Sequence, residues 1–407
     1  MPTKRHGAAD AAEEVSPRYF GWRVVFACFL MALCAWGFAF YGHAVYLTEL
    51  QRLHGWSTSL ISGASTVTLL TGGLLVVFAN DIIERVGART LVIGGAGIVG
   101  LSLVLLAFAS SPWQLYLAYL LMSFAWISMG TPAITIVLSH WFQHRRGFAM
   151  SLALNGASFG GIVVAPLLLY LISTTGFRNT MFVAAALVAA LLIPSALAWV
   201  GPPAAGIDVA KSENAPGAMT KGEALRDLTF MLLAGTFAVG LIAQVGFLVH
   251  QIAFLQSVMG TARAGLAVAL TTFMAVVGRV ALGSVIDSFD PRRATAATFA
   301  SQAAVFAAMT FTTDVSLLLI LCCVFGFSAG NLLTLPQVTI QKEFPPASFG
   351  TLVALASAIV TLVAAGGPWL IGLVRDATGG YEAGLWLCAA LGALAAVVVL
   401  IRPRAGA

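Results

Sequence analysis

Charged side chains are excluded from long stretches of this chain, which restricts the folds that it can adopt. Hydrophobic residues make up 59% of the 407 residues and Asp, Glu, Lys and Arg only 9%, whereas soluble domains carry about 25% charged residues. Apolar runs long enough to cross the hydrocarbon layer, about 20 residues each, recur along nearly the whole length. The chain therefore reads as an all-α membrane protein in a lipid bilayer. We count twelve predicted spans, near 21–47, 57–79, 89–110, 113–138, 147–173, 180–200, 229–256, 264–286, 294–312, 315–340, 348–374 and 383–401.

The distribution of Lys and Arg predicts the orientation of these spans. With both termini in the cytoplasm, the basic residues of the loops and tails fall inside except for Arg52, Arg178, Arg263 and Arg375, as the positive-inside rule requires. The basic residues are scattered over short loops and form no continuous face, so no nucleic-acid partner is expected. We expect a multi-pass protein of the cell (inner) membrane.

A polar stretch rich in Gly, Pro, Ala and Lys divides the spans into two sets of six. Such a composition is typical of a linker. We therefore expect a cytoplasmic N-terminal tail at 1–18, an N-terminal six-helix half at 19–200, a cytoplasmic linker at 201–227, a C-terminal six-helix half at 228–401 and a cytoplasmic tail at 402–407.

Short landmarks recur in the two halves at a nearly constant spacing. They pair Arg146-Gly147 with Phe349-Gly350, Ala165-Pro166 with Gly367-Pro368, and Thr175-Gly176 with Thr378-Gly379. Together they indicate a duplicated bundle. In secondary transporters, parallel halves of this kind surround a site near the membrane midplane, and rocking of the halves exposes it alternately to each side.

Four segments of the chain carry motifs of a known family: residues 54–57 (His-Gly-Trp-Ser), the loop 80–89, residues 141–147 and the pair Gly278-Arg279. They resemble the major facilitator superfamily and, within it, the bacterial branch near the monocarboxylate and oxalate:formate transporters. The resemblance covers essentially the whole chain. It implies the major facilitator fold, with twelve transmembrane helices in two pseudo-symmetric halves of six, and a monomer without cofactor or metal.

The resemblance also implies residues that latch the cytoplasmic ends of the halves. The superfamily signature between spans two and three has a Gly, an Asp and an Arg, and here Asn80, Glu84 and Arg89 stand at these positions. The first two depart from the pattern, whereas the second half is closer to it. We expect gating by Glu84, Arg89, Arg146, Asp287 and Arg292.

Arg279 is the one basic residue that cannot be placed in a loop, at a helix end or in a tail. A guanidinium at membrane depth persists mainly where it faces a cavity and meets an anion, and its planar fork suits a carboxylate. In the resembling transporters, an Arg in span eight contacts the substrate carboxylate. The structural alternative is an Arg bonded to helix-end carbonyls of the other half.

Two departures from these relatives favour a monoanion over a dicarboxylate. Relatives can carry an acidic residue one turn before the Arg, but Ala275 stands there. The oxalate:formate branch has a second cation, a Lys in span eleven, and none occurs between Ser348 and Val374. A substrate that needs two cationic partners is therefore disfavoured.

The usual carboxylate proton carrier is missing, because no Asp or Glu can be placed in mid-membrane. His43 in span one and His250 in span seven are the coupling candidates, since imidazole titrates near physiological pH. The structural alternative for each is a neutral histidine satisfied by hydrogen bonds. Two other routes remain open: an anion and H⁺ binding together at Arg279, or the exchange of one anion for another.

Further polar side chains inside the spans are candidates for substrate binding. Such groups either select the substrate or hydrogen-bond helices to one another. With Arg279 and the two histidines, the set comprises Tyr41, Tyr119, Asn155, Gln251, Asn331 and Gln337.

The sequence thus predicts a secondary active transporter that moves a small organic monoanion, monocarboxylate-like, by alternating access with H⁺ coupling or exchange. The alternative is an efflux transporter for amphipathic or aromatic compounds, in which Arg279 would serve gating. An enzyme is not expected, because no nucleophile–base pair or metal-ligand cluster occurs among the spans.

Overall fold

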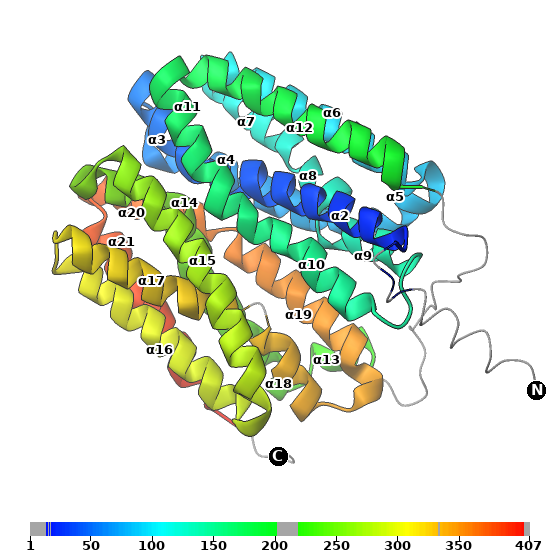
Figure 1. The fold of residues 1–407 in the computed structure, drawn as a ribbon. Coiled ribbons are helices and arrows are strands. Elements are labelled where there is room, and N and C mark those ends of the chain that lie inside the picture. The colour runs from blue at the N-terminus through cyan, green and yellow to red at the C-terminus, as the bar shows by residue number, and fades with distance from the viewer. Residues whose placement is uncertain (1–13, 15, 17, 202–218, 333, 403–407) are drawn as a thin grey trace, which may run out of the picture. The chain divides into compact units, whose positions relative to one another are not determined.

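The computed structural model describes residues 14, 16, 18–201, 219–332 and 334–402. These residues are almost entirely helical and include no strand (Figure 1). This follows from the apolar runs, because backbone N–H and C=O groups in lipid must be bonded within their own segment. The all-helical fold class predicted from the sequence is confirmed.

The contacts between residues divide the chain into two compact units. Unit 1 lies within residues 1–42 and 71–210, and unit 2 lies within residues 43–70 and 211–407. Residues 43–70 thus group with the C-terminal part of the chain, although the repeat assigns them to the N-terminal half. The six-helix halves at 19–200 and 228–401 stay a prediction.

Unit 1 consists of the helices that precede the linker, apart from residues 43–70. They are α2 (Gly21–Trp36), the π-helix η1 (Gly37–Tyr41), the end of α4 (Thr58–Val76), α5 (Ala79–Val86), α6 (Ala88–Ala107), α7 (Pro112–Met122), α8 (Phe124–Met129), α9 (Thr131–Ser139), α10 (Arg146–Phe159), the π-helix η2 (Gly160–Val164), α11 (Ala165–Thr175) and α12 (Phe177–Trp199).

Unit 2 consists of the helices after the linker together with one earlier helical hairpin. They are α3 (Gly42–His54), the start of α4, α13 (Lys221–Ala224), α14 (Leu228–Met259), α15 (Thr261–Val285), the 3₁₀ turn η3 (Ile286–Ser288), α16 (Pro291–Thr310), α17 (Val315–Asn331), α18 (Leu335–Glu343), the 3₁₀ turn η4 (Pro346–Ser348), α19 (Phe349–Ala364), α20 (Gly367–Thr378) and α21 (Glu382–Val398).

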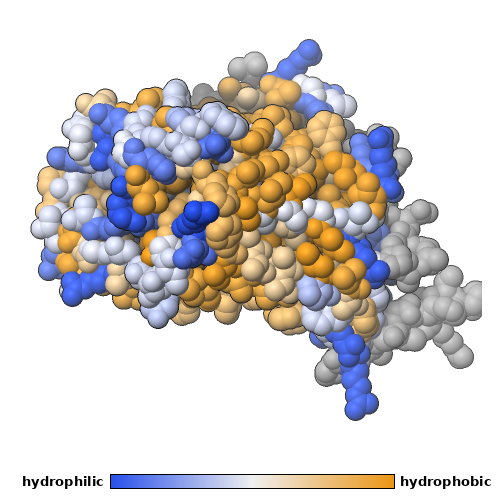
Figure 2. All heavy atoms as spheres, turned by 90° about the horizontal axis from the view of Figure 1, so that it is seen from above, coloured by the Kyte–Doolittle hydropathy of each residue, from blue (hydrophilic) through white to orange (hydrophobic). Residues whose placement is uncertain are grey.

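Among the residues described, 10 helical segments are long and apolar enough to cross a membrane. Two further predicted spans correspond to α16, which has 20 residues and a more polar composition, and α21, an apolar helix of 17 residues. The twelve predicted spans thus all coincide with helices. The space-filling view agrees, since one face shows a broad hydrophobic area with hydrophilic residues mostly around it (Figure 2).

The recurring landmarks begin corresponding helices. α10 begins at Arg146 and α19 at Phe349, while α11 and α20 begin at the paired Ala-Pro and Gly-Pro steps. Gly176 and Gly379 both have positive φ, 82° and 76°, just before α12 and α21, a conformation that glycine adopts without steric cost. The repeat is therefore expressed as matching helix starts.

Glycines bring helices of the same unit into backbone contact. In unit 1, a Cβ on Gly156 would collide with Phe29 of α2. In unit 2, a Cβ on Gly246 of α14 would lie 2.9 Å from the carbonyl oxygen of Gly367, where α20 begins. Small residues at such crossings are typical of membrane helices, which associate by close packing.

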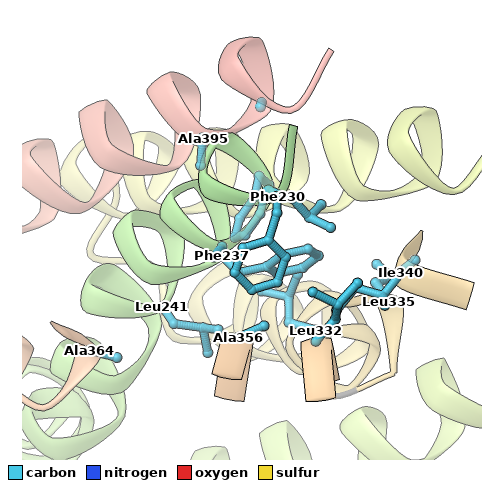
Figure 3. Close-up of a cluster of buried hydrophobic side chains, with 14 of the residues drawn as sticks. Phe230, Phe237, Leu241, Leu332, Leu335, Ile340, Ala356, Ala364 and Ala395 are labelled. Atoms are coloured by element: carbon cyan, nitrogen blue, oxygen red, sulfur yellow. The ribbon is translucent and has the colours of Figure 1, made fainter. Parts of the chain in front are cut away.

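The core of unit 2 has an aromatic centre (Figure 3). Phe230 and Phe237 of α14 are 0% and 1% exposed and pack with Leu332 and Leu335, which flank the break between α17 and α18. The packing of these large apolar side chains fixes the position at which α17 ends and α18 begins. The break is thus part of a packed structure.

Arg292 of α16 forms hydrogen bonds both to α18 and to the residues that follow α21. Its side chain is 2% exposed, and its Nε and Nη2 donate to the two carboxylate oxygens of Glu343 at 2.6 and 2.7 Å. Its Nη1 donates to the carbonyl oxygens of Val399 and Ile401 at 2.9 and 2.6 Å. A buried guanidinium with this many strong partners has a structural role in unit 2.

We expect Gly246→Ala to lower the midpoint of thermal unfolding, because overpacking costs about 1–3 kcal/mol. Gly235, on the same helix, has nothing within 4 Å of an added Cβ. Gly235→Ala should therefore leave the midpoint unchanged or raise it, because alanine favours the helix over glycine by up to about 1 kcal/mol. Thermal unfolding of the purified proteins in one detergent compares them. Equal midpoints for the two variants would contradict the backbone contact.

Arg292→Gln should destabilise the protein strongly, since removing one partner of a buried ion pair costs about 3–5 kcal/mol. The neighbouring Arg293 is exposed, so Arg293→Gln serves as the matched control and should behave as the wild type. The readout is the fraction of monodisperse protein that survives heating. Equal survival of both variants would remove the structural role of Arg292.

Candidate functional site

Arg279 lies on α15 beside a break in a neighbouring span. Its half-buried side chain directs Nε toward the carbonyl oxygen of Gly330, 3.5 Å away, one residue before α17 ends at Asn331. The same span resumes as α18 at Leu335. Irregular backbone at membrane depth occurs where it is buried in protein or lines a cavity. The carbonyl oxygen of Gly330, in the last turn of α17, thus lies next to the guanidinium of Arg279.

The hydrogen bond of Arg279 to Gly330 is long compared with those of Arg292. At 3.5 Å it stands at the outer limit for a hydrogen bond, whereas the bonds of Arg292 measure 2.6–2.9 Å. Gly330 belongs to the same unit as Arg279. A carboxylate forms shorter, charge-assisted bonds with a guanidinium, so an anion offers Arg279 a stronger partner than this carbonyl does.

Asn331 adds a buried amide at the same break. The residue is 4% exposed, and its Oδ1 has no hydrogen-bond partner among the described residues. Buried side-chain oxygens are normally bonded. An amide oxygen in this position suits a ligand hydroxyl or a water molecule as donor.

Gln251 bonds three helices of unit 2 together. Its Nε2 donates to Thr271 Oγ1 of α15 at 2.8 Å, and Thr271 Oγ1 donates to the carbonyl oxygen of Cys322 of α17 at 3.3 Å. Gln251 Oε1 is buried without a hydrogen-bond partner in the described part of the chain. These contacts indicate that Gln251 hydrogen-bonds helices to one another, while its Oε1 stays available as an acceptor.

His250 is bonded through both ring nitrogens. Nε2 lies 2.9 Å from the carbonyl oxygen of Pro368, and Nδ1 lies 3.2 Å from the hydroxyl of Tyr381. A carbonyl can only accept, so Nε2 carries the proton and Nδ1 accepts from Tyr381. Burial raises the pKa of the Tyr381 hydroxyl, which keeps it a phenol donor. The neutral imidazole is thus fully satisfied in this arrangement.

The remaining substrate-binding candidates are spread over both units. His43 is fully buried in α3 of unit 2, with its ring centroid 6.4 Å from that of Tyr46. In unit 1, Tyr41 ends η1, Tyr119 is fully buried in α7, and Asn155 is half-buried in α10; Gln337 of unit 2 is exposed on α18. Of the predicted set, Arg279 and Asn331 both lie near the end of α17, because Arg279 contacts Gly330, the residue before Asn331.

Unit 1 contains two π-helices that were not predicted. The segments η1 and η2 interrupt the spans Gly21–His54 and Arg146–Thr175 and pack against each other through Gly37 and Gly160. Insertions of this kind are frequent at functional sites. The Gly-rich stretch around Gly160 was the available signal, and the sequence analysis did not predict π geometry from it.

The gating candidates differ in their contacts. Arg89 donates from Nε to the carbonyl oxygen of Val200 at 2.7 Å, which links the start of α6 to the end of α12. Glu84 and Arg146 are exposed. Arg292 has the buried contacts described above, and the side chains of Asn80 and Asp287 lie outside the described residues.

Glu14 is a further functional candidate that sequence reasoning missed. It is 4% exposed, and its carboxylate accepts the backbone N–H groups of Gln143, His144 and Arg145 at 2.8–3.3 Å. The segment before α2 thereby holds the loop before α10. The sequence shows Glu14 only as one polar residue of a tail, so it carried no signal for this contact.

Unit 2 has a cavity of about 640 Å³ where α3, α14, α20 and α21 meet. Two guanidinium groups line it, those of Arg52 and Arg375, together with Tyr381 and Glu382. Arg52 is bonded to the carboxylate of Glu49 at 2.8 and 2.9 Å. Arg375 is likewise paired with the carboxylate of Asp376 at 3.3 Å, so with Glu382 the cavity has no excess of positive charge.

Comparisons with known proteins give the same family as the sequence motifs. The model of the Major Facilitator Superfamily matches residues 24–368 and 259–407. Monocarboxylate transporter 13 of Rattus norvegicus is 26% identical over 383 residues, which cover 89% of this chain and 84% of the relative. Monocarboxylate transporter 11 of Mus musculus is 28% identical over 344 residues, 79% of this chain and 74% of the relative.

A solved structure shows the same fold. The crystal structure of a mutant of the nucleoside transporter NupG superposes with a TM-score of 0.74 at 15% sequence identity, covering 94% of this chain and 99% of that one. The resemblance stated from the motifs is thereby confirmed. The chain belongs to the Major Facilitator Superfamily and is a multi-pass membrane transporter, not an enzyme.

Proposed function

We propose that this transporter moves a small organic monoanion, monocarboxylate-like, by alternating access. Its place is the cell (inner) membrane, with both termini cytoplasmic. The observation that carries the proposal is the position of the half-buried Arg279 guanidinium near the end of α17, with its Nε 3.5 Å from the carbonyl oxygen of Gly330. The residue after Gly330, Asn331, has a buried side-chain oxygen without a hydrogen-bond partner among the described residues. The names of the relatives, monocarboxylate transporters, support the same substrate class.

The roles at the site follow from the chemistry of these groups. Arg279 grips the carboxylate through charge-assisted bonds that replace the contact with Gly330. The acceptor Oδ1 of Asn331 binds a hydroxyl or water attached to the anion. A single guanidinium neutralises one charge, which is why a monoanion fits better than a dicarboxylate.

Transport is driven by a proton gradient or by exchange of anions. For proton coupling, His250 is the best-connected candidate, because its Nδ1 can take up a proton if Tyr381 turns from donor to acceptor. His43 is the second candidate, fully buried on α3. In exchange, no protein group needs to titrate.

The second candidate function, efflux of amphipathic or aromatic compounds, has one observation in its favour. The rings of Trp36 and Trp126 in unit 1 lie 5.1 Å apart, with Phe40 6.4 Å from Trp126. The Trp126 indole Nε1 is buried without a hydrogen-bond partner among the described residues. An aromatic wall with an available N–H donor suits a flat ligand.

Arg279→Gln should abolish uptake of lactate, pyruvate or a small aromatic acid into proteoliposomes, because the neutral amide cannot form the charge-assisted bonds. Arg279→Lys should retain part of the uptake with a raised KM, since lysine keeps the positive charge but cannot form two parallel hydrogen bonds to a carboxylate. Arg263 is exposed on the same helix, so Arg263→Gln is the matched control. Uptake by folded Arg279→Gln at the wild-type rate would refute the anion anchor.

His250→Gln should weaken accumulation driven by an inward pH gradient more than anion exchange at equal pH, because the amide of Gln does not titrate. His54 is exposed at the end of α3, so His54→Gln should change neither mode. Both modes are measured in the same vesicles. Equal loss of the two modes would assign His250 a structural role, and unchanged accumulation would exclude it as a proton carrier.

A further inference from the structure

The start of α4 and helix α20, both in unit 2, meet along one polar face (both helices are labelled in Figure 1). A Cβ on Gly372 would collide with Ser62 Oγ and lie 2.9 Å from Cα of Ser59. One turn before Gly372, the backbone N–H of Trp369 donates to Thr66 Oγ1 at 3.3 Å. Glycine and hydroxyl residues therefore set the distance between these helices.

Asp376 lies one turn beyond Gly372 and binds the first turn of α4. Its Oδ1 accepts the backbone N–H of Thr58 at 3.1 Å, and its Oδ2 accepts that of Ser59 at 2.7 Å. α4 begins at Thr58, so both donors belong to the helix N-terminus, where N–H groups have no partner within the helix. The negative charge also interacts favourably with the helix dipole.

The capping is reciprocal. The carboxylate of Asp376 on α20 caps the first turn of α4, and the hydroxyl of Thr66 on α4 accepts an N–H from the first turn of α20, which begins at Gly367. Arg375 contributes a 3.3 Å contact from Nη1 to Asp376 Oδ1. If the two helices separated, each would expose unpaired N–H groups at its N-terminus.

The unit boundaries give this contact a consequence for transport. By the sequence repeat, residues 43–70 belong to the first half, yet their contacts place them in unit 2 together with α20. The bonds of Asp376 and Thr66 are polar bridges between this hairpin and the C-terminal part of the chain. Water can replace polar bonds to backbone N–H groups, so these bridges can break when the two helices separate.

We propose that Asp376 is a latch that holds α4 on α20 in the closed arrangement of this end of unit 2, and that transport requires its release. The inference rests on the alternating access proposed above. Under the predicted orientation, this end faces outward. The latch is distinct from the anion anchor at Arg279, because Asp376 binds backbone N–H groups at the start of α4.

The test measures opening directly, with no transport assay. Ser62 is fully buried against Gly372, so a cysteine introduced by Ser62→Cys reports separation of the two helices. The purified protein in nanodiscs, where both faces are accessible, is reacted with a water-soluble maleimide. Protein without the Ser62→Cys change gives the background, since the native cysteines in the described residues are buried or half-buried.

Asp376→Asn should raise the labelling rate of this cysteine about fivefold or more, because the amide loses the charge and one acceptor oxygen. Glu382 is an exposed carboxylate just beyond α20, and Glu382→Gln is the matched control, expected to label as the parent does. Equal labelling of the Asp376→Asn and parent proteins, both folded, would overturn the latch.

A second pair of variants tests the donor side with the carboxylate intact. Thr58→Pro removes one N–H that Asp376 accepts, at a first helical position where proline is tolerated. Thr58→Val removes the hydroxyl and keeps the N–H. Faster labelling in Thr58→Pro than in Thr58→Val supports the latch even if Asp376→Asn does not fold, and equal labelling contradicts it.

The outcome separates the latch from the proposed function. Increased labelling in Asp376→Asn, together with transport that fails for every carboxylate tested, would support the latch and refute the substrate class. Unchanged labelling, together with carboxylate uptake that depends on Arg279, would support the anchor and refute the latch.

Discussion

The cost of an uncompensated charge in hydrocarbon governs this structure. Burying an unpaired charge is expensive, most of all at membrane depth, and three charged residues of unit 2 have different partners. Arg292 is buried against Glu343 and two carbonyl groups, so its charge stabilises unit 2. Asp376 is bonded to helix N–H groups. Arg279 lies half-buried on α15 with its Nε 3.5 Å from the carbonyl oxygen of Gly330 near the end of α17, and it is the charge that we propose to bind the cargo.

These three residues also suggest how binding and opening are divided within unit 2. The anchor at Arg279 lies between α15 and the end of α17, whereas the latch lies between α20 and α4. His250 of α14 connects to the start of α20 through its bond to the carbonyl oxygen of Pro368. A titrating His250 would therefore act on the same helix that the latch holds, which gives proton coupling a physical route to opening.

Much of the fold could be predicted because helix starts and spans depend on local residues. The paired landmarks at Arg146 and Phe349 begin corresponding helices, and each predicted span coincides with a helix. Contacts between residues far apart in the chain could not be predicted from the sequence. The contact between Asp376 and the start of α4 joins positions far apart in the chain, and Glu14 binds a distant loop through its backbone. Backbone N–H groups have no residue signature, so no pattern in the sequence could show these partners.

The central claim, that Arg279 binds the carboxylate of the cargo, is tested most directly by ligand-induced stabilisation of the purified protein. A ligand that binds the folded state raises its unfolding midpoint as its concentration exceeds the dissociation constant. A panel of monocarboxylates is compared with the corresponding uncharged amides, for example lactate with lactamide. The account predicts that a carboxylate raises the midpoint and its amide does not, and that Arg279→Gln removes the difference. Equal stabilisation by acid and amide, or a difference that persists in Arg279→Gln, would contradict it.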